Sequence, residues 1–147
     1  MAVGGTVSTP IFKQDGQYLT FTVESAAVTL GQVVATYSTT SPATVTVAGA
    51  GDLGIIGVAV SGNRISRTAT ADTVEIGDKV TVCTRGVCNC VVAAAGSTFG
   101  ASQIAGAAGT VTDASTATYV SDLRGQLGVA LKTGTTGEVI PVLLTIR

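Results

Sequence analysis

The sequence of 147 residues contains no histidine and no tryptophan, and only three tyrosines and three phenylalanines. Without imidazole, the chain cannot build a Ser-His or Cys-His nucleophile, and it has no side chain whose ordinary pKa lies near neutrality. We therefore expect no enzyme activity, no catalytic residue, no cofactor and no metal site. The few aromatic rings also argue against carbohydrate binding, because sugar sites usually stack their ligand on exposed rings.

Charged residues are also few, at 12% of the chain, and the net charge is −1. The eight cationic side chains form no basic block of the kind that phosphate contacts need, so we expect no nucleic-acid partner. Residues 25–51 and 86–112 carry no charge, but polar residues and glycines interrupt both segments, so neither is typical of a membrane span. The opening MAVGGTVSTP lacks the pattern of a secretory signal, and we expect synthesis inside the cell.

Small and β-branched residues dominate the chain, since Thr, Val, Ala and Gly make up 84 of the 147 positions. Runs rich in Val, Ile, Thr and aromatic residues, most of them alternating, predict strands at residues 18–23, 43–47, 79–83 and 139–146. Many short strands separated by turns indicate a mainly β single domain, a sandwich or a small β-barrel. The best helix candidate is residues 114–124, with Asp113 as N-cap, so we expect at most one short helix.

The first twenty residues differ from the rest, because two glycines, a proline and a polar run precede the first regular strand. We interpret residues 1–20 as an extended N-terminal arm and residues 21–147 as the β-rich domain. A terminus without a function is the alternative, since chain ends are commonly disordered unless they are tied down.

The sequence contains two glycine-containing patterns of interest, one a candidate nucleotide-binding motif and one a repeated structural segment. The segment Gly49-Ala-Gly-Asp-Leu-Gly54 matches a dinucleotide-binding fingerprint, but a strand-like segment follows it where that fingerprint requires a helix, so we predict a loop. The segments Gly57-Val-Ala-Val60 and Gly128-Val-Ala-Leu131 echo each other. Either the match is chance in this composition, or both glycines let a strand bend or another backbone approach closely.

Three cysteines lie close together at Cys83, Cys88 and Cys90. We predict a hairpin that turns at Arg85-Gly86 and places Cys83 opposite Cys88. Three free, buried thiols are one outcome and a Cys83–Cys88 disulfide is another. Structural zinc would need a distant carboxylate as its fourth ligand. The acidic residues Asp72, Glu75 and Asp78 are three apart, and we interpret them as a solvated edge.

Several short motifs follow one another in a recognisable order along residues 30–147. They are Gly77-Asp-Lys-Val-Thr-Val82, Gly86-Val87, Val91-Val-Ala-Ala94, Gly109-Thr-Val111, Gly128-Val-Ala-Leu131 and Gly137-Glu-Val-Ile-Pro-Val-Leu-Leu144. This progression resembles the small capsid decoration, or cement, proteins of tailed phages. The resemblance implies a β-tulip-like or small-barrel body on the outer surface of a phage capsid, commonly as a homotrimer, in virions assembled in the host cytoplasm.

The resemblance also implies that the N-terminal arm pairs with strands of the major capsid protein. An extended segment can add a strand to an exposed sheet edge, and Pro10 would end such pairing because it lacks a donor. The expected contact residues are Val3, Thr6, Val7, Ser8, Thr9, Pro10, Ile11 and Phe12. The alternative function is a tail- or fibre-associated ligand-binding β module.

Overall fold

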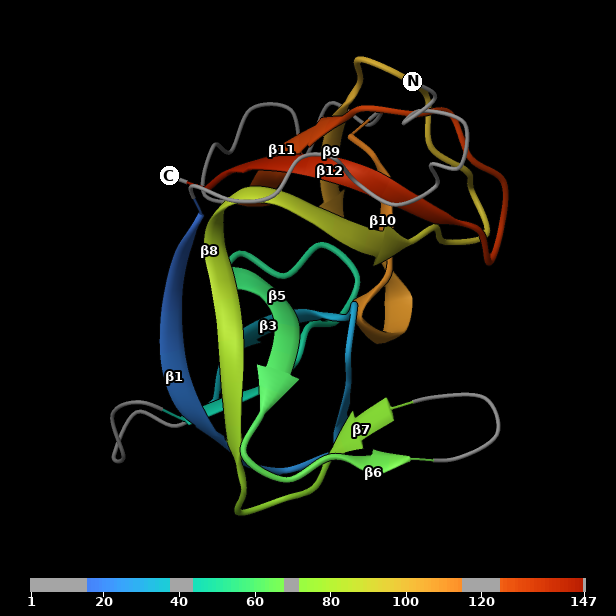
Figure 1. The fold of residues 1–147 in the computed structure, drawn as a ribbon. Helices are drawn as coiled ribbons and strands as arrows, with labels where there is room; N and C mark the ends of the chain where they lie inside the picture. The colour runs from blue at the N-terminus through green and yellow to red at the C-terminus, as the bar shows by residue number, and fades with distance from the viewer. Residues whose placement is uncertain (1–15, 38–43, 68–71, 115–124, 147) are drawn as a thin grey trace, which may run out of the picture.

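The computed structural model describes residues 16–37, 44–67, 72–114 and 125–146, and these form a mainly β domain (Figure 1). The predicted fold class is therefore confirmed. One nine-stranded sheet carries the fold, and a small three-stranded sheet, β2-β7-β6, flanks it. The strands are β1 Gln17–Val23, β2 Val28–Thr29, β3 Val33–Thr36, β4 Thr44–Val47, β5 Ile55–Gly62, β6 Ser66–Arg67, β7 Asp72–Val74, β8 Lys79–Val91, β9 Ser102–Ala105, β10 Val111–Asp113, β11 Gln126–Ala130 and β12 Val139–Thr145.

The first half of the described chain closes into a small barrel, which we call barrel 1. Its strand order is β1-β4-β3-β5-β8, and β1 also pairs with β8, so the sheet returns to its own start. Pairing is antiparallel except between β1 and β4, which run parallel at Val23 and Val45. Alternating Val and Thr residues suit this arrangement, because β-branched side chains pack well on a pleated surface that is buried on one face.

The second half repeats this closure and forms barrel 2, with the order β8-β12-β11-β9-β10. A parallel bridge between Val92 and Val111, together with the Ala93 N–H that donates to the Val111 carbonyl at 2.8 Å, joins β10 back to the end of β8. Strand β8 is therefore the last strand of barrel 1 and the first strand of barrel 2. It bends sharply between its two halves, and Gly86 takes a φ of +115° at the bend (Figure 1).

The two barrels match position by position. In barrel 1, the Gly31 N–H donates to the Ala59 carbonyl at 2.8 Å, and in barrel 2 the Gly100 N–H donates to the Ala130 carbonyl at 2.8 Å. The parallel closure also recurs, since the Glu24 N–H donates to the Val45 carbonyl at 2.9 Å just as Ala93 does to Val111. The chain is thus an internal structural repeat in which β1, β3, β4, β5 and the first half of β8 correspond to the second half of β8, β9, β10, β11 and β12.

Gly57 and Gly128 occupy the same place in this repeat. A Cβ atom at Gly57 would overlap the Cys83 carbonyl oxygen, and one at Gly128 would overlap the Leu143 carbonyl oxygen. Cys83 and Leu143 are themselves equivalent, because they pair with Val58 and Val129, the residues after the two glycines. The predicted reason for the two Gly-Val-Ala segments, close approach of another backbone, is confirmed.

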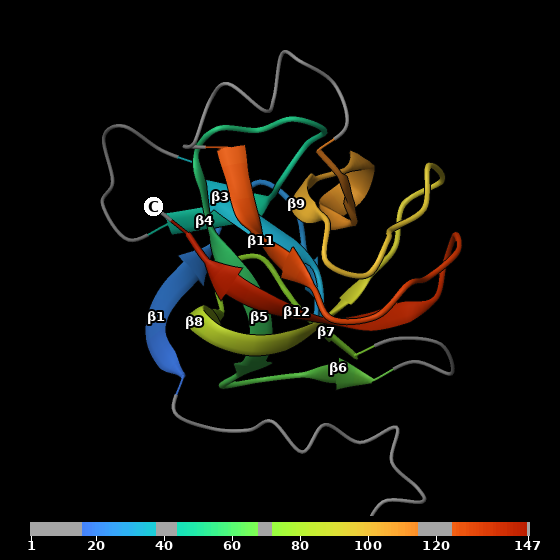
Figure 2. The same cartoon turned by 90° about the horizontal axis from the view of Figure 1, so that it is seen from above.

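Two groups of buried side chains hold the fold together. One group, which includes Val23, Val45, Val80 and Val82, fills barrel 1. The other includes Leu127, Ile140 and Val142 of barrel 2 together with Val33 and Val58 from the outer face of barrel 1. Because β3 and β5 contribute to both groups, they are buried on both faces. Seen from above, β11 and β12 lie over the strands of barrel 1 (Figure 2).

The hairpin predicted at Arg85-Gly86 is wrong, because Lys79–Val91 is one continuous strand. Its two halves pair with different partners, β5 and β1 before the bend and β12 after it, so the chain bends at Gly86 without reversing. The Gly49–Gly54 segment is a loop between β4 and β5, as predicted. The helix candidate lies outside the described residues apart from Asp113, which ends β10, and Ala114.

Candidate functional site

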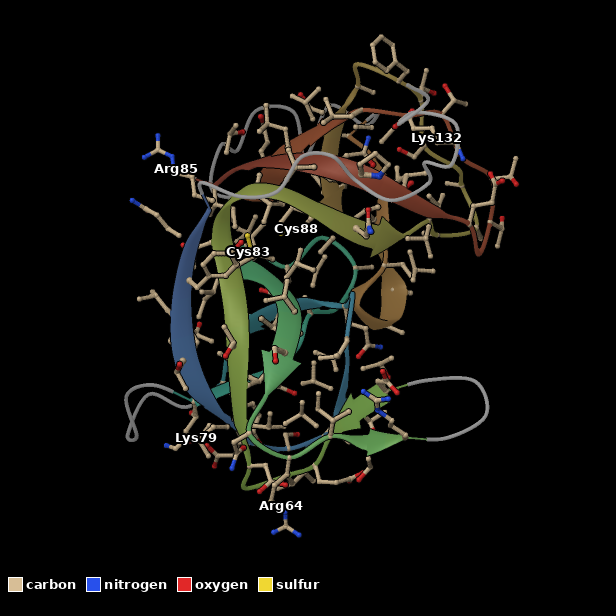
Figure 3. All side chains as sticks on the ribbon, in the orientation of Figure 1. Arg64, Lys79, Cys83, Arg85, Cys88 and Lys132 are labelled. Atoms are coloured by element: carbon tan, nitrogen blue, oxygen red, sulfur yellow. The ribbon has the colours of Figure 1, made fainter. Side chains whose placement is uncertain are left out.

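Four positively charged side chains of the described residues lie apart from one another. Arg64, Lys79, Arg85 and Lys132 lie at separate points of the surface (Figure 3). Asp72 is in contact with Arg67 at 3.9 Å, and both side chains are exposed, so this pair belongs to a solvated edge. Among the residues that the structure describes, no group of three or more His, Cys, Asp or Glu side chains could hold a metal ion.

The three cysteines are buried free thiols on the inner side of the β8 bend. Cys83 precedes the bend and Cys88 follows it, and their side chains are hydrogen-bonded to each other. The bend at Gly86 brings them together (Figure 3), although they lie on one strand and not on the two arms of a hairpin. The proximity that the sequence suggested is therefore present for a different reason.

The pairing of Cys83 with Cys88 changes the acidity of both groups. The hydrogen bond from the Cys88 thiol lowers the pKa of Cys83 to about 7, although burial opposes this shift. The same hydrogen bond and burial raise the pKa of Cys88. Burial raises the pKa of Cys90 to about 12. Among the described residues, the groups that act on Cys83 are the Cys88 thiol and the Arg85 backbone, and neither is a general base, so the arrangement favours a thiol pair with one acidic member over a catalytic nucleophile.

A buried polar cluster distinguishes barrel 2 from barrel 1. The Ser97 hydroxyl donates to Gln103 Oε1 at 2.9 Å, and Gln103 Nε2 donates to Asp113 Oδ1 at 2.7 Å. Burial tends to raise the pKa of Asp113, but hydrogen bonds from the Thr98 amide and from Gln103 hold that pKa below its usual value. These groups satisfy one another, so the cluster stabilises barrel 2 and offers no open position to a ligand.

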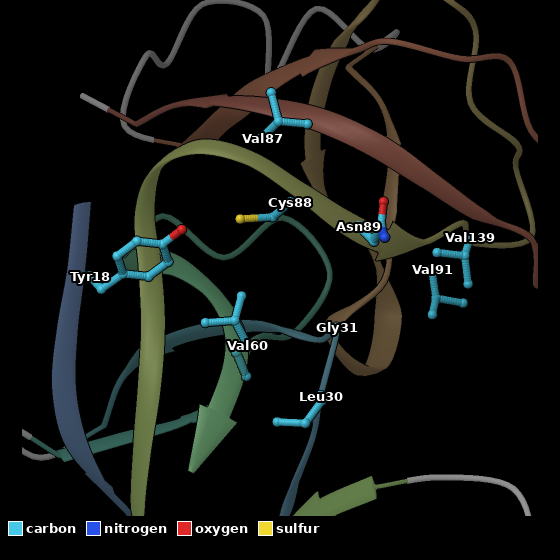
Figure 4. A pocket seen from close by; sticks show the side chains of 10 residues that line it. Tyr18, Leu30, Gly31, Val60, Val87, Cys88, Asn89, Val91 and Val139 are labelled. Carbon is cyan, nitrogen blue, oxygen red and sulfur yellow. The ribbon is translucent and has the colours of Figure 1, made fainter. Parts of the chain in front are cut away.

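A groove of about 510 Å³ lies where the two barrels meet, in the angle between the two halves of β8 (Figure 4). Ten residues line it, Tyr18, Leu30, Gly31, Ala59, Val60, Val87, Cys88, Asn89, Val91 and Val139. None of them is an acid or a base that is charged at neutral pH. The groove is suited to contact with apolar groups, and it lacks the convergent polar residues of a specific small-molecule site.

The start of β1 is exposed on both faces. Residues 17–20 are all exposed, and Tyr18 and Leu19 are 52% and 54% accessible although they point to opposite sides. The described chain begins beside the β8 bend, where a Cβ atom at Gly16 would lie 2.8 Å from the Arg85 carbonyl oxygen. The N-terminal segment therefore enters the domain through an exposed strand that carries large apolar side chains.

The predicted contact residues, Val3 and Thr6–Phe12, lie outside the described residues. The last residues of the predicted arm, from Gln17 onward, belong to β1 and to barrel 1. Sequence reasoning missed the apolar groove, whose lining comes from several strands and loops, and it missed the exposed end of β1. The signal in the sequence was the alternation of Leu19, Phe21 and Val23 with Thr20 and Thr22, which did not indicate which face of the strand would be covered.

In the part of the chain that the structure describes, no helix is long and apolar enough to cross a membrane. The family model described as "Structural cement protein (E217 gp24/Pam3 gp6)" matches residues 2–145. Among solved structures, the chain is similar to "The crystal structure of head fiber gp8.5 N base in bacteriophage phi29", with a TM-score of 0.60 and 16% identity over 88% of this chain and 94% of that chain. At this identity the likeness concerns the fold alone. No curated protein matches the chain.

Proposed function

The chain belongs to the phage structural cement protein family, and from this premise we propose that it binds the outer surface of a phage head and stabilises the shell. Membership of this family implies a general role as a structural component of a phage particle that is associated with the capsid. The proposal adds the outer surface, the major capsid protein as partner, the host cytoplasm as the place of assembly and the absence of catalysis. The match over residues 2–145 is the observation that carries it.

The proposed mechanism is mechanical and depends on the N-terminal arm. Residues 1–15 lead into a strand that is exposed on both faces from Gln17 to Thr20. An arm anchored in this way can add a strand to a sheet edge of the capsid protein, where main-chain hydrogen bonds supply the affinity. Val3, Val7, Ile11 and Phe12 would then fill apolar pockets beside that edge.

A homotrimer would strengthen this attachment. Three linked arms bind with greater avidity than one arm, because the second and third contacts form at a high effective concentration. Self-association would also cover exposed apolar side chains such as Tyr18 and Leu19. Weak individual contacts would therefore suffice to brace neighbouring capsid proteins.

Co-sedimentation with undecorated heads of the phage that encodes the protein tests the proposal. The full chain is compared with a chain that lacks residues 1–15, which leaves β1 and both barrels complete. We expect saturable binding of the full chain in a fixed ratio to the major capsid protein, and loss of binding on truncation. Matching denaturant midpoints for the two proteins control for folding.

Two results would contradict the proposal in different ways. Undiminished binding of the truncated chain would remove the arm from the mechanism but leave the cement role. No binding by the full chain would overturn the cement role and favour the ligand-binding module, for which a glycan array is the next measurement. Among the described residues that line the groove, Tyr18 is the one with an aromatic ring for such a ligand to stack on.

A further inference from the structure

Each barrel has an end that corresponds to an end of the other barrel, and these two ends differ in how well they are covered. At one end of barrel 2, five side chains are at most 6% exposed, Cys88, Cys90, Ala105, Leu127 and Leu144. They share one buried cluster with Val33, Ala35, Val58 and Cys83 of barrel 1. The outer face of β3, β5 and β8 in barrel 1 therefore covers this end of barrel 2.

The register of the repeat identifies the matching end of barrel 1. Leu19 pairs with Val82 in barrel 1, and the equivalent pair in barrel 2 is Cys88 with Val142. Likewise, Thr36 pairs with Val45 in barrel 1, and the equivalent pair in barrel 2 is Ala105 with Val111. The matching side chains, which we call the open end, are Leu19, Phe21, Thr36, Ile56 and Thr84. None of them is fully buried, and Leu19 is 54% exposed. The described part of the chain therefore leaves this end without the cover that its counterpart has.

Barrel 2 carries the counterpart of the covering surface. Ala35, Val58 and Cys83 in barrel 1 correspond by register to Ile104, Val129 and Leu143 in barrel 2, which we call the outer face. Ile104 is buried, whereas Val129 is partly accessible and Leu143 is 38% exposed. One molecule thus exposes an open end on barrel 1 and an outer face on barrel 2, and the equivalents of these two surfaces are already packed against each other inside the molecule.

We infer that the open end of barrel 1 in one copy receives the outer face of barrel 2 from a second copy, so that the internal barrel-to-barrel contact is repeated between molecules. This inference rests on the self-association proposed above. The two surfaces are different, so the contact is heterologous, and it can satisfy every copy only by closing into a ring. Apolar side chains on both sides supply the driving force.

Site-directed cross-linking tests the direction of this contact. Leu19→Cys and Leu143→Cys are made separately, and a short bis-maleimide is added to each variant alone and to a mixture, at a concentration where the native chain self-associates. The native thiols are at most 6% exposed, and the native chain is the control for their reaction. We expect cross-linked dimers from the mixture and few from either variant alone. Self-cross-linking of Leu19→Cys alone would indicate an isologous contact and overturn the inference.

Charge substitution supplies an independent measurement. Leu19→Asp and Leu143→Asp should each weaken self-association in sedimentation velocity by about tenfold or more, because each places a carboxylate in an apolar contact. Ile76→Asp is the matched control, since Ile76 is 59% exposed and lies on neither surface. Equal effects of all three variants, or a native chain that stays monomeric and uncross-linked at high concentration, would overturn the inference. Co-sedimentation with heads tests the cement role separately, so failure of this contact can be distinguished from failure of the cement role.

Discussion

At the scale of single residues, glycine determines how closely the strands approach. Gly57 and Gly128 lie where a neighbouring carbonyl oxygen occupies the space that a side chain would need. Backbone atoms cannot move aside as a flexible side chain can, so a methyl group there would force strands apart. The chain retains glycine at the same place in both barrels because the same strand crossing occurs twice.

Gly57→Ala and Gly128→Ala should each lower the free energy of unfolding by at least about 2 kcal/mol, because the added methyl group meets backbone. Gly49→Ala is the control, since no atom lies within 4 Å of a Cβ there and its φ is not positive. We expect the control to change stability by about 0.5 kcal/mol or less in urea denaturation. Equal losses for all three variants would show that glycine content, and not the close approach, limits stability.

The thiol pair leads to a second prediction at this scale. Cys83 is the more reactive thiol near neutral pH because its lowered pKa leaves a larger fraction of it as thiolate, whereas the raised pKa of Cys90 keeps that thiol protonated. Cys88 is the hydrogen-bond partner of Cys83, so mild oxidation should join these two and leave Cys90 reduced. With diamide as oxidant, the two thiols lose two protons and two electrons, and the diazene becomes the hydrazine. Peptide mapping should find the Cys83–Cys88 bond in Cys90→Ala and no bond in Cys88→Ala. Bonds that include Cys90 would contradict the prediction.

At the scale of elements, the same strand order supports two different interiors. Val28, Val34 and Val47 in barrel 1 correspond by register to Ser97, Gln103 and Asp113 in barrel 2. The equivalent amides of Thr29 and Thr98 also find different acceptors, Gln32 Oε1 at 2.8 Å in barrel 1 and Asp113 Oδ1 at 2.9 Å in barrel 2. At these equivalent positions the fold accommodates either apolar side chains or polar side chains that hydrogen-bond to one another, provided that every polar group has a partner.

Transfer of the barrel 1 residues into barrel 2 tests this equivalence. Gln103→Val alone should cost about 1–3 kcal/mol, because it leaves Ser97 and Asp113 with unmet hydrogen bonds. The combination Ser97→Val, Ala101→Gln, Gln103→Val and Asp113→Val should recover part of that loss, since it removes the whole polar set and restores an acceptor for Thr98. A combination no better than the single change, in urea denaturation at pH 7, would contradict the equivalence.

The same variants should differ in acid. Because the pKa of Asp113 is lowered in the folded protein, its contribution to stability is present above its usual pKa of 3.8 and is lost as the pH falls through the lower folded value. The combined variant lacks this carboxylate. Its denaturant midpoint should therefore fall less than that of the native chain between pH 5 and about pH 2.

At the scale of the whole molecule, the two barrels cannot separate without breaking both. Strand β8 belongs to each barrel, and the outer face of barrel 1 is part of the buried cluster of barrel 2. Hydrogen bonds also connect the barrels, since the Gly51 N–H donates to the Ala105 carbonyl at 2.8 Å and the Gly109 N–H donates to the Ala48 carbonyl at 2.9 Å. We therefore expect the repeat to unfold as one cooperative unit in spite of its two closures.

Leu127→Ala should reveal this cooperativity. Leu127 is fully buried in barrel 2, and its truncation should cost about 2–5 kcal/mol. Hydrogen exchange should then accelerate by a similar factor in β3 of barrel 1 and in β11 of barrel 2, because both exchange through the same global unfolding. Acceleration confined to barrel 2 would show that barrel 1 folds alone. Leu53→Ala serves as the control, because that side chain is 41% exposed.

Much of the fold could be predicted from local pattern. Alternating Val and Thr residues located β1, β4, β12 and the start of β8, and the repeated Gly-Val-Ala segments indicated a close backbone approach. The bend at Gly86 could not be predicted, because a glycine between two strand-like runs fits a hairpin as well as a bent strand. The choice depends on which partners each half finds, and those partners are distant in sequence.

The sequence by itself determined that the protein is mainly β, that it has no histidine for catalysis or metal binding, and that its motifs resemble those of phage cement proteins. These properties follow from composition and from short-range order, which need no knowledge of distant contacts. Only the tertiary structure decided that β8 belongs to two barrels and that Cys83 meets Cys88 across a bend. It also decided that the described residues cover one barrel end and leave its counterpart exposed. Each of these depends on long-range pairing, which packing and strand closure fix and local pattern leaves open.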